Sequence, residues 1–252
     1  MKHIFILAAA FCVVQSAAAQ AQYTPPPSSA QAVQGVPWAN AVAAGARFRD
    51  RFRECETRNT CKGRPLKYGC GKDPSRNTTI LRFPDGTIFF DGKMGLDADG
   101  SPYSRNTPGQ TDKPKTSYRY EVPGKPSVDA DKVPFIVMPK GGFGEDLGLD
   151  VGDVAAVVYE GKVSYALVAD RGPDCKIGEG SIELQEELGH KVCRARNAKE
   201  ECTNLRNAGI GSGVLYFIFP KSKISGLTPA NAVQRIREKG EKLFTAFRPS
   251  TD

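Results

Sequence analysis

The stretch VAAVVYEGKVSYALVADRGPDCKIGEGSIELQEELG, residues 154–189, joins two β-prone runs to a loop of unusual composition. Valine, alanine and aromatic residues dominate residues 154–170, and Glu160-Gly161 interrupts them as a tight turn would. These residues predict a β-hairpin. After Asp170 the chain adds acidic side chains, glycines, a proline and a cysteine, which is more than a connecting turn requires. We therefore expect a functional loop at the end of the second strand.

Further short β-prone runs lie on both sides of this hairpin. They are Thr78–Phe83, Thr87–Phe90, residues 133–139 and residues 213–220. Asp85-Gly86 predicts a hairpin turn between the first two runs. Helical spacing of apolar residues predicts helices over Trp38–Cys55, Ser181–Gly189 and Pro229–Phe247. Many short strands with few helices predict a mostly β fold, either a small closed barrel or a sandwich.

The amino terminus has the pattern of a secretory signal peptide. Lys2 precedes an apolar run, and small residues follow at Ala17 to Ala19. No later segment approaches the roughly 20 apolar residues of a membrane span, so we expect a soluble exported protein without membrane insertion. The predicted organisation is a signal peptide (1–19), a disordered linker rich in Pro, Ser, Gln and Ala (20–36), a helical, cysteine-containing extension (37–75), a catalytic β-barrel domain (76–225), and a carboxy-terminal helix and tail (226–252).

Six cysteines remain after removal of the signal peptide, which takes away Cys12. They form two clusters of three, Cys55, Cys61 and Cys70, then Cys175, Cys193 and Cys202. An even number of cysteines in an exported protein predicts disulfides. Three is odd, so complete pairing requires at least one bridge between the clusters. We expect this bridge to attach the amino-terminal extension to the acidic loop.

The charge balance excludes one class of partner. The exported chain has 34 basic and 28 acidic residues, a formal charge of +6. It has no run of lysine or arginine typical of nucleic-acid binding, and export makes that partner improbable. The arginines of the predicted amino-terminal helix are interpreted as a solvated face.

Several kinds of catalytic site are excluded by composition. The exported chain has one histidine, His190, so a multi-histidine metal site is not available. A Ser-His-Asp triad would depend on His190, which we interpret as a surface or helix-terminal residue rather than a catalytic base. Residues 209–213, GIGSG, lack a following helix and are interpreted as a turn rather than a phosphate-binding loop. We expect no cofactor.

Carboxylates are the remaining catalytic candidates. Asp170 closes a β-prone run, and Glu179 follows nine residues later, after Gly172, Pro173 and Gly178 have turned the chain. Glycosidic bond cleavage uses one carboxylic acid to protonate the leaving oxygen and one carboxylate to activate water or attack the sugar. The sequence leaves inversion and retention open. A capping aspartate and a surface glutamate are the structural alternatives.

A second acidic group lies in FFDGKMGLDADG, with Asp91, Asp97 and Asp99 on a glycine-containing segment after a strand. It matches a calcium-binding loop only in part, because the third acidic position and the terminal glutamate are missing. We predict substrate binding or turn formation here, and no metal.

Several ordered motifs resemble glycoside hydrolase family 75, the chitosanases known best from fungi. They are DGKMGLDADGSP (91–102), VPFIVMP (133–139), LGLDVGDVAAVVYEGKVSYALVADRGP (147–173), IGEGSIELQEELG (177–189) and GVLYFIFPKS (213–222). The resemblance implies endo-cleavage of β-1,4-linked glucosamine polymers with inversion, catalysed by Asp170 and Glu179. By the usual division of labour Glu179 would be the acid and Asp170 the base, although the resemblance does not decide this. It also implies that Asp97 and Asp99 bind the substrate ammonium groups.

A fainter resemblance concerns the fold. VADRGP followed by an acidic residue and a short helix is similar to a segment of rare-lipoprotein-A-like proteins and, more distantly, of expansins. This likeness implies a six-stranded double-psi β-barrel, here with a few peripheral helices and a disulfide-linked, helical amino-terminal extension.

Three function hypotheses follow from these observations. The leading one is a secreted, monomeric chitosanase whose substrate-binding residues include Asp91, Arg171 and Tyr165 besides Asp97 and Asp99. The second is a peptidoglycan-acting glycosidase of the cell envelope, which the basic net charge favours. The third is a non-catalytic polysaccharide-binding barrel.

Overall fold

The computed structural model describes residues 23–248 except 67–69, 71–78, 105–113 and 207. The predicted signal peptide therefore lies outside the described residues. The strands are β1 (Val42–Ala43), β2 (Thr60–Cys61), β3 (Arg64–Pro65), β4 (Ile80–Arg82), β5 (Ile88–Asp97), β6 (Phe135–Pro139), β7 (Val154–Tyr159), β8 (Lys162–Gly172), β9 (Glu179–Ser181), β10 (Cys193–Arg196), β11 (Cys202–Leu205) and β12 (Ile210–Phe219). The helices are α1 (Ala46–Arg58), α2 (Phe143–Leu147), α3 (Ile182–Glu187) and α4 (Ala232–Phe247), with 3-10 turns η1 (Pro27–Ser29), η2 (Gln31–Val33) and η3 (Trp38–Asn40).

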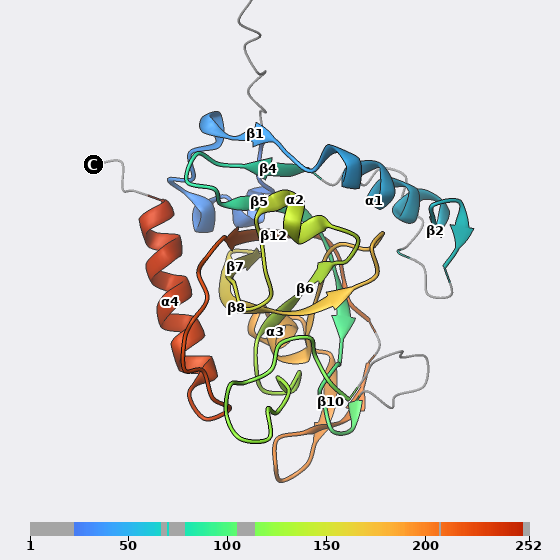
Figure 1. Ribbon diagram of the computed structural model, residues 1–252, viewed down its shortest axis with the longest axis vertical. Helices are drawn as coiled ribbons and strands as arrows, with labels where there is room; N and C mark the ends of the chain where they lie inside the picture. Colours follow the sequence, from blue (N-terminus) through green and yellow to red (C-terminus); the bar gives the residue numbers. More distant parts are fainter. Residues whose placement is uncertain (1–22, 67–69, 71–78, 105–113, 207, 249–252) are drawn as a thin grey trace, which may run out of the picture.

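The centre of the protein is a closed, mixed six-stranded β-barrel. Its strand order is β5-β12-β7-β8-β6-β9, and pairing of β9 with β5 closes the ring. Pairs β6–β8 and β5–β9 are parallel, whereas β12 pairs antiparallel with both of its neighbours. Alternate side chains of the strands fill the interior, among them Phe90, Ile136, Val157, Val168 and Tyr216. The prediction of a closed barrel is confirmed, and α3, α4 and the extension lie around it (Figure 1).

The hairpin at the centre of the predicted sheet forms as expected. β7 and β8 pair antiparallel from Val154↔Leu167 to Tyr159↔Lys162. Glu160 and Gly161 connect them with φ values of 46° and 78°. Two successive left-handed residues define a type I′ turn, whose twist matches that of the flanking strands.

The segment expected to be a disordered linker is folded over residues 23–36. Val33 and Val36 are buried in one outer cluster with Phe89 of β5 and Phe217 of β12. The Tyr23 ring packs edge-on against Phe89, with 4.7 Å between ring centroids. The prediction was wrong because it rested on average composition. The few apolar side chains of the segment match an apolar outer face of the barrel, and burying that face stabilises the turns.

The helix of the extension is shorter and later than predicted. α1 begins after Gly45, because Val42 and Ala43 upstream form β1 and pair with β4. Its apolar face presents Phe48 and Phe52, which join the same cluster as the barrel interior. Figure 1 shows α1 and the β2–β3 hairpin on the side of the barrel away from α4.

The carboxy-terminal helix begins three residues later than the predicted Pro229. Asn231 occupies the cap position, and its side-chain oxygen accepts a hydrogen bond from the Thr228 main chain. α4 packs Phe244 and Phe247 on the outer face of β12. Among the described residues, no helix has the length and apolar character that crossing a bilayer requires.

All six cysteines of the described chain form disulfides: Cys55–Cys70, Cys61–Cys175 and Cys193–Cys202. The second bridge joins the two cysteine clusters and attaches the extension to the acidic loop, as predicted. The other two bridges lie within clusters.

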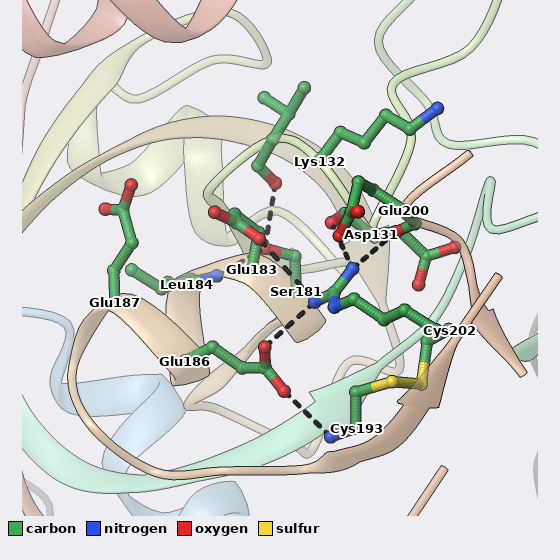
Figure 2. Close-up of polar contacts among 12 residues, drawn as sticks. Asp131, Lys132, Ser181, Glu183, Leu184, Glu186, Glu187, Cys193, Glu200 and Cys202 are labelled. Carbon is green, nitrogen blue, oxygen red and sulfur yellow. Dashed lines mark hydrogen bonds and ion pairs between the residues drawn. A yellow bond between two sulfur atoms is a disulfide. The ribbon is translucent and has the colours of Figure 1, made fainter. Parts of the chain in front are cut away.

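A polar network around Arg196 holds the β10–β11 hairpin against α3. Figure 2 shows Asp131, Glu186 and Glu200, which contact the guanidinium. The guanidinium contacts a Glu186 oxygen at 2.9 Å, and the other Glu186 oxygen accepts from the Cys193 main chain at 2.8 Å. Ser181 caps α3 by accepting from the Leu184 N–H. Because Ser181 ends β9, this network fixes the strand that closes the barrel.

We expect loss of the Cys61–Cys175 bridge to destabilise the protein more than loss of Cys193–Cys202. The bridges close segments with separations of 114 and 9 residues. Loop-closure entropy grows with the logarithm of length, so the two losses in unfolding free energy should differ by about 2 kcal/mol. Chemical denaturation of the two double cysteine-to-alanine variants measures this difference. Equal losses would contradict the entropic explanation.

Candidate active site

Asp170 lies near the end of β8, where a bulge turns it to the outer face of the barrel. In the β6–β8 pair the register advances from Ile136↔Val168 to Val137↔Asp170, so Ala169 is the extra residue. Three donors converge on Oδ1 of Asp170: the Ser117 main chain (2.9 Å), the Ser117 hydroxyl and the Arg171 main chain (2.7 Å). These donors fix the orientation of the carboxylate, and among the described residues the hydrogen bonds to Asp170 end on Oδ1.

Glu179 begins β9, between β5 and β6. Gly95 is its register partner on β5, and Gly180 pairs with Ile136 on β6. A Cβ atom on Gly172 would lie 2.8 Å from Oε2 of Glu179, so the carboxylate sits directly over Gly172. Gly172 is two residues beyond Asp170 on the same strand, and such residues share a face. The two carboxylates therefore lie on one side of the barrel wall.

Asp97 and Asp99 join them at the end of β5. Carboxylate oxygens of Asp97, Asp99 and Asp170 lie within 4.8 Å of one another. Burial, followed by the charges of Asp99, Glu179 and Asp170, raises the pKa of Asp97 well above its ordinary value. We call Asp97, Asp99, Asp170 and Glu179 the acidic cluster. Asp170 and Glu179 are only 7% and 8% exposed, which strengthens electrostatic interactions among these groups.

The two basic residues of the loop differ in their contacts. Lys176 donates to Oε1 of Glu179 at 2.6 Å. The Arg171 side chain instead pairs with Asp150 at 2.9 Å, and Lys223 binds the other oxygen of Asp150. The predicted substrate-binding residue Arg171 thus reaches the acidic cluster through its main chain, while its guanidinium is engaged elsewhere.

Two other predicted substrate-binding residues lie away from the acidic cluster. Asp91 accepts hydrogen bonds from the Tyr23 hydroxyl and the Thr79 main chain. Tyr165 packs under α4, where a Cβ on Gly240 would lie 2.7 Å from its ring. The sequence places both near catalytic residues along the chain, but five or six strand residues, about 17–20 Å, separate them from the acidic cluster.

The loop between Asp170 and Glu179 is fastened to the extension. Cys175 is bonded to Cys61, and Lys62 contacts Asp174 at 2.5 Å. This arrangement restricts the turn that carries Glu179.

Sequence reasoning missed Ser117 and Lys93. Ser117 lies 53 residues before Asp170 in a polar segment without a motif. No sequence pattern therefore predicts its hydrogen bonds to Asp170. Lys93 could have been predicted to be paired, because a lone lysine inside a buried strand requires a partner of opposite charge. That partner is Glu56 of α1.

The carboxylates of Asp97, Asp99 and Asp170 have the donor chemistry of a hard cation site. The three residues each offer one oxygen within this range, whereas calcium takes six to eight oxygen ligands. Burial, followed by the charges of the neighbouring carboxylates, raises the pKa of Asp97. The second close group, Cys61, Asp174 and Cys175, contains a disulfide, whose sulfurs are not thiolate ligands.

A model of protein families described as the fungal chitosanase of glycosyl hydrolase group 75 matches residues 94–246. The chain belongs to glycoside hydrolase family 75. The match covers more than half of the chain and contains all four members of the acidic cluster. A comparison with curated proteins finds no significant match. Lys93 and the whole extension precede the region matched to family 75.

Asparagine in place of Asp97 should stabilise the protein at neutral pH. The folded protein retains the Asp97 proton at pH values where the unfolded chain, with a pKa near 3.8, has released it. Stability is therefore lost as the pH rises above 3.8, and Asp97→Asn removes that loss. We expect a higher unfolding free energy than wild type at pH 7 and a smaller advantage at pH 4, measured by urea denaturation.

The exposed Asp50 supplies the control for this comparison, since its side chain is 82% exposed. Asp50→Asn should change stability little at either pH. An Asp97→Asn variant that is destabilised equally at both pH values would contradict the electrostatic explanation.

Proposed function

We propose that this protein is a secreted, endo-acting chitosanase that hydrolyses β-1,4-linked glucosamine polymers with inversion. Membership of family 75 supports the substrate class. The observation that carries the proposal is the meeting of Asp170 and Glu179 on one outer face of the barrel, joined by Asp97 and Asp99.

Asp170 suits the role of general base. Three hydrogen bonds to Oδ1 fix the orientation of this carboxylate. Oδ2 then orients the attacking water and accepts its proton as the oxygen bonds to the anomeric carbon.

We assign the role of general acid to Glu179, since Asp170 serves as the base. Lys176 donates to Oε1, so the proton for the leaving glycosidic oxygen is carried on Oε2. This oxygen lies over Gly172 and faces the same wall as Asp170. The bond between the anomeric carbon and the leaving oxygen breaks as the proton transfers, and Glu179 is reprotonated from solvent.

Strand geometry favours inversion. Residues two apart on a strand are about 6.6 Å apart along it, and Glu179 lies over the second residue after Asp170. Inverting enzymes place their carboxyl groups about 6.5–9.5 Å apart, which leaves room for water.

The acidic cluster also favours a cationic polymer. The exported chain carries +6, which by itself would suit the anionic polymers associated with peptidoglycan. Screening at physiological salt limits surface fields to about 8 Å, however, so a polymer in the site responds mainly to Asp97, Asp99 and their neighbours. We assign these aspartates to the ammonium groups of glucosamine.

Fold type, compartment and oligomeric state belong to the same proposal. The two parallel pairs within a mixed six-stranded barrel support the double-psi type. Disulfides and the predicted signal peptide support export to an oxidising compartment. We propose a monomer, which light scattering of the purified protein tests.

Conservative replacement of either catalytic carboxylate should abolish hydrolysis. Asp170→Asn and Glu179→Gln keep the shape of each side chain but remove base and acid, so we expect kcat on soluble chitosan to fall on the order of 10² to 10⁴-fold. Reducing-end release measures the rate, and NMR of the first product measures the anomeric configuration. Asp50→Asn is the matched exposed control.

Different outcomes distinguish the competing functions. If the wild type is inactive on chitosan but releases muropeptides from sacculi, the substrate is peptidoglycan rather than chitosan. Binding to insoluble polysaccharide without any product, unaffected by either replacement, would indicate a non-catalytic barrel.

Gly172→Ala should impair catalysis by displacing Glu179. The new methyl group would lie 2.8 Å from Oε2 of Glu179 and 2.9 Å from Val137. Misplacement by about 1 Å can lower the rate about 10²-fold, so we expect a loss of that size in kcat with a retained fold by circular dichroism. Gly92→Ala is the control, since no atom lies within 4 Å of its Cβ position. Unchanged activity in Gly172→Ala would contradict the placement of Glu179.

A further inference from the structure

Lys93 is a buried lysine next to the turn that carries Glu179. It lies on β5 and is only 8% exposed. Its ammonium group donates to the Cys70 carbonyl and pairs with the Glu56 carboxylate, which is itself 3% exposed. Glu56 and Cys70 both belong to the extension. A charge this deeply buried is held only where its partners are fixed.

The main chain of Lys93 directly supports the residue before Glu179. A Cβ on Gly178 would lie 2.2 Å from the Lys93 carbonyl oxygen, and Gly178 has a φ of 78°. The Tyr216 hydroxyl donates to the same carbonyl at 2.8 Å. A shift of Lys93 therefore moves the turn at Gly178, and with it the start of β9.

The Lys93 ammonium also acts on the charges of the active site. Burial lowers the pKa of Lys93, and pairing with the Glu56 carboxylate raises it. Among the weaker influences, the charge of Lys176 lowers this pKa and that of Glu179 raises it. The loop that precedes Glu179 is attached to the same extension by Cys61–Cys175. The extension therefore holds this loop directly through the disulfide and indirectly through Lys93.

We propose that Glu56 is a positioning residue of the active site, acting through Lys93 to hold the Gly178 turn and the Lys176–Glu179 pair in their reactive arrangement. Glu56 then contributes to the site although it precedes the region matched to family 75. The inference rests on the proposed role of Glu179.

Removal of the Glu56 charge has a directional consequence. The groups that face Lys93 and Glu179 are Glu56 from α1, Lys176 from the loop, Asp97 from β5 and Tyr216 from β12. Without Glu56, the positive charge of Lys93 acts on Glu179 without compensation at every pH where Lys93 stays protonated. A nearby positive charge favours the ionised carboxylate, so Glu179 loses its proton at lower pH. If Glu179 is the acid, the alkaline limb of the pH profile shifts to lower pH.

The test is Glu56→Gln, with kcat and KM on soluble chitosan measured across the pH range. We expect kcat to fall on the order of tenfold, KM to change less than twofold, and the alkaline limb to shift to lower pH. Glu56→Asp, which keeps the charge, should recover part of kcat and restore the limb.

Glu54→Gln is the matched control on the same helix. The Glu54 carboxylate binds Thr60, Lys62 and Gly63 within the extension. This variant should lower stability without moving kcat or the limb. If Glu54→Gln and Glu56→Gln lower activity equally and neither moves the limb, Glu56 is only structural and the proposal is overturned.

Two further measurements cover the remaining outcomes. If Glu56→Gln does not fold, the double variant Glu56→Gln with Lys93→Met replaces the pair by uncharged groups. In this double variant we expect the reduced kcat of Glu56→Gln but an alkaline limb of the pH profile at the wild-type position. A kcat equal to that of the wild type would overturn the proposal. Carbon-13 NMR titration of the Glu179 carboxyl, assigned with Glu179→Gln, requires no substrate. An unshifted titration in Glu56→Gln overturns the inference even if the wild type does not cleave chitosan, which would separately refute the proposed function.

Discussion

A strand of three residues, β9, closes the barrel, and the same strand carries Glu179. It fits between β5 and β6 because two positions lack a Cβ: at Gly178 a Cβ would meet the Lys93 main chain, and at Gly180 it would meet the Met94 and Leu184 side chains. The closure of the fold and the placement of the proposed acid are thus one constraint. A change that loosens β9 opens the barrel and separates Glu179 from Asp170 at the same time.

Gathering four carboxyl groups on one wall is electrostatically unfavourable, and three features offset the cost. Ser117 donates twice to Asp170, Lys176 pairs with Glu179, and the raised pKa of Asp97 keeps its proton over a wider pH range. Lys93 is close by, but Glu56 neutralises it, so it adds little net positive charge to the cluster. The cluster therefore stays negative on a protein whose net charge is positive, which suits a cationic polymer.

The sequence was most informative where a feature depends on residues close together in the chain. The β7–β8 hairpin followed from residues 154–170, and Asp170 and Glu179 followed from a strand end and a stapled loop. The parity of the cysteine clusters required the inter-cluster bridge that Cys61–Cys175 forms. Side-chain contacts between segments far apart in the chain could not be predicted from local patterns. Ser117 meets Asp170, and Glu56 meets Lys93, through packing that no single stretch of sequence encodes. Asp91 and Tyr165 lie away from the acidic cluster because five or six residues of an extended strand, about 17–20 Å, separate each of them from it.

The boundary of the family match does not coincide with a boundary of the fold. The match begins at Met94, inside β5, whereas all but one of the residue pairs between β5 and β12 involve residues before it. β12 would lose most of its pairing with β5 if the chain began at residue 94, and the barrel would open along that seam. The Cys61–Cys175 bridge and the Glu56–Lys93 pair cross the same boundary. The extension and the matched region are therefore one cooperative unit, in which the family-matched residues supply the carboxylates and the preceding residues supply much of what holds them still.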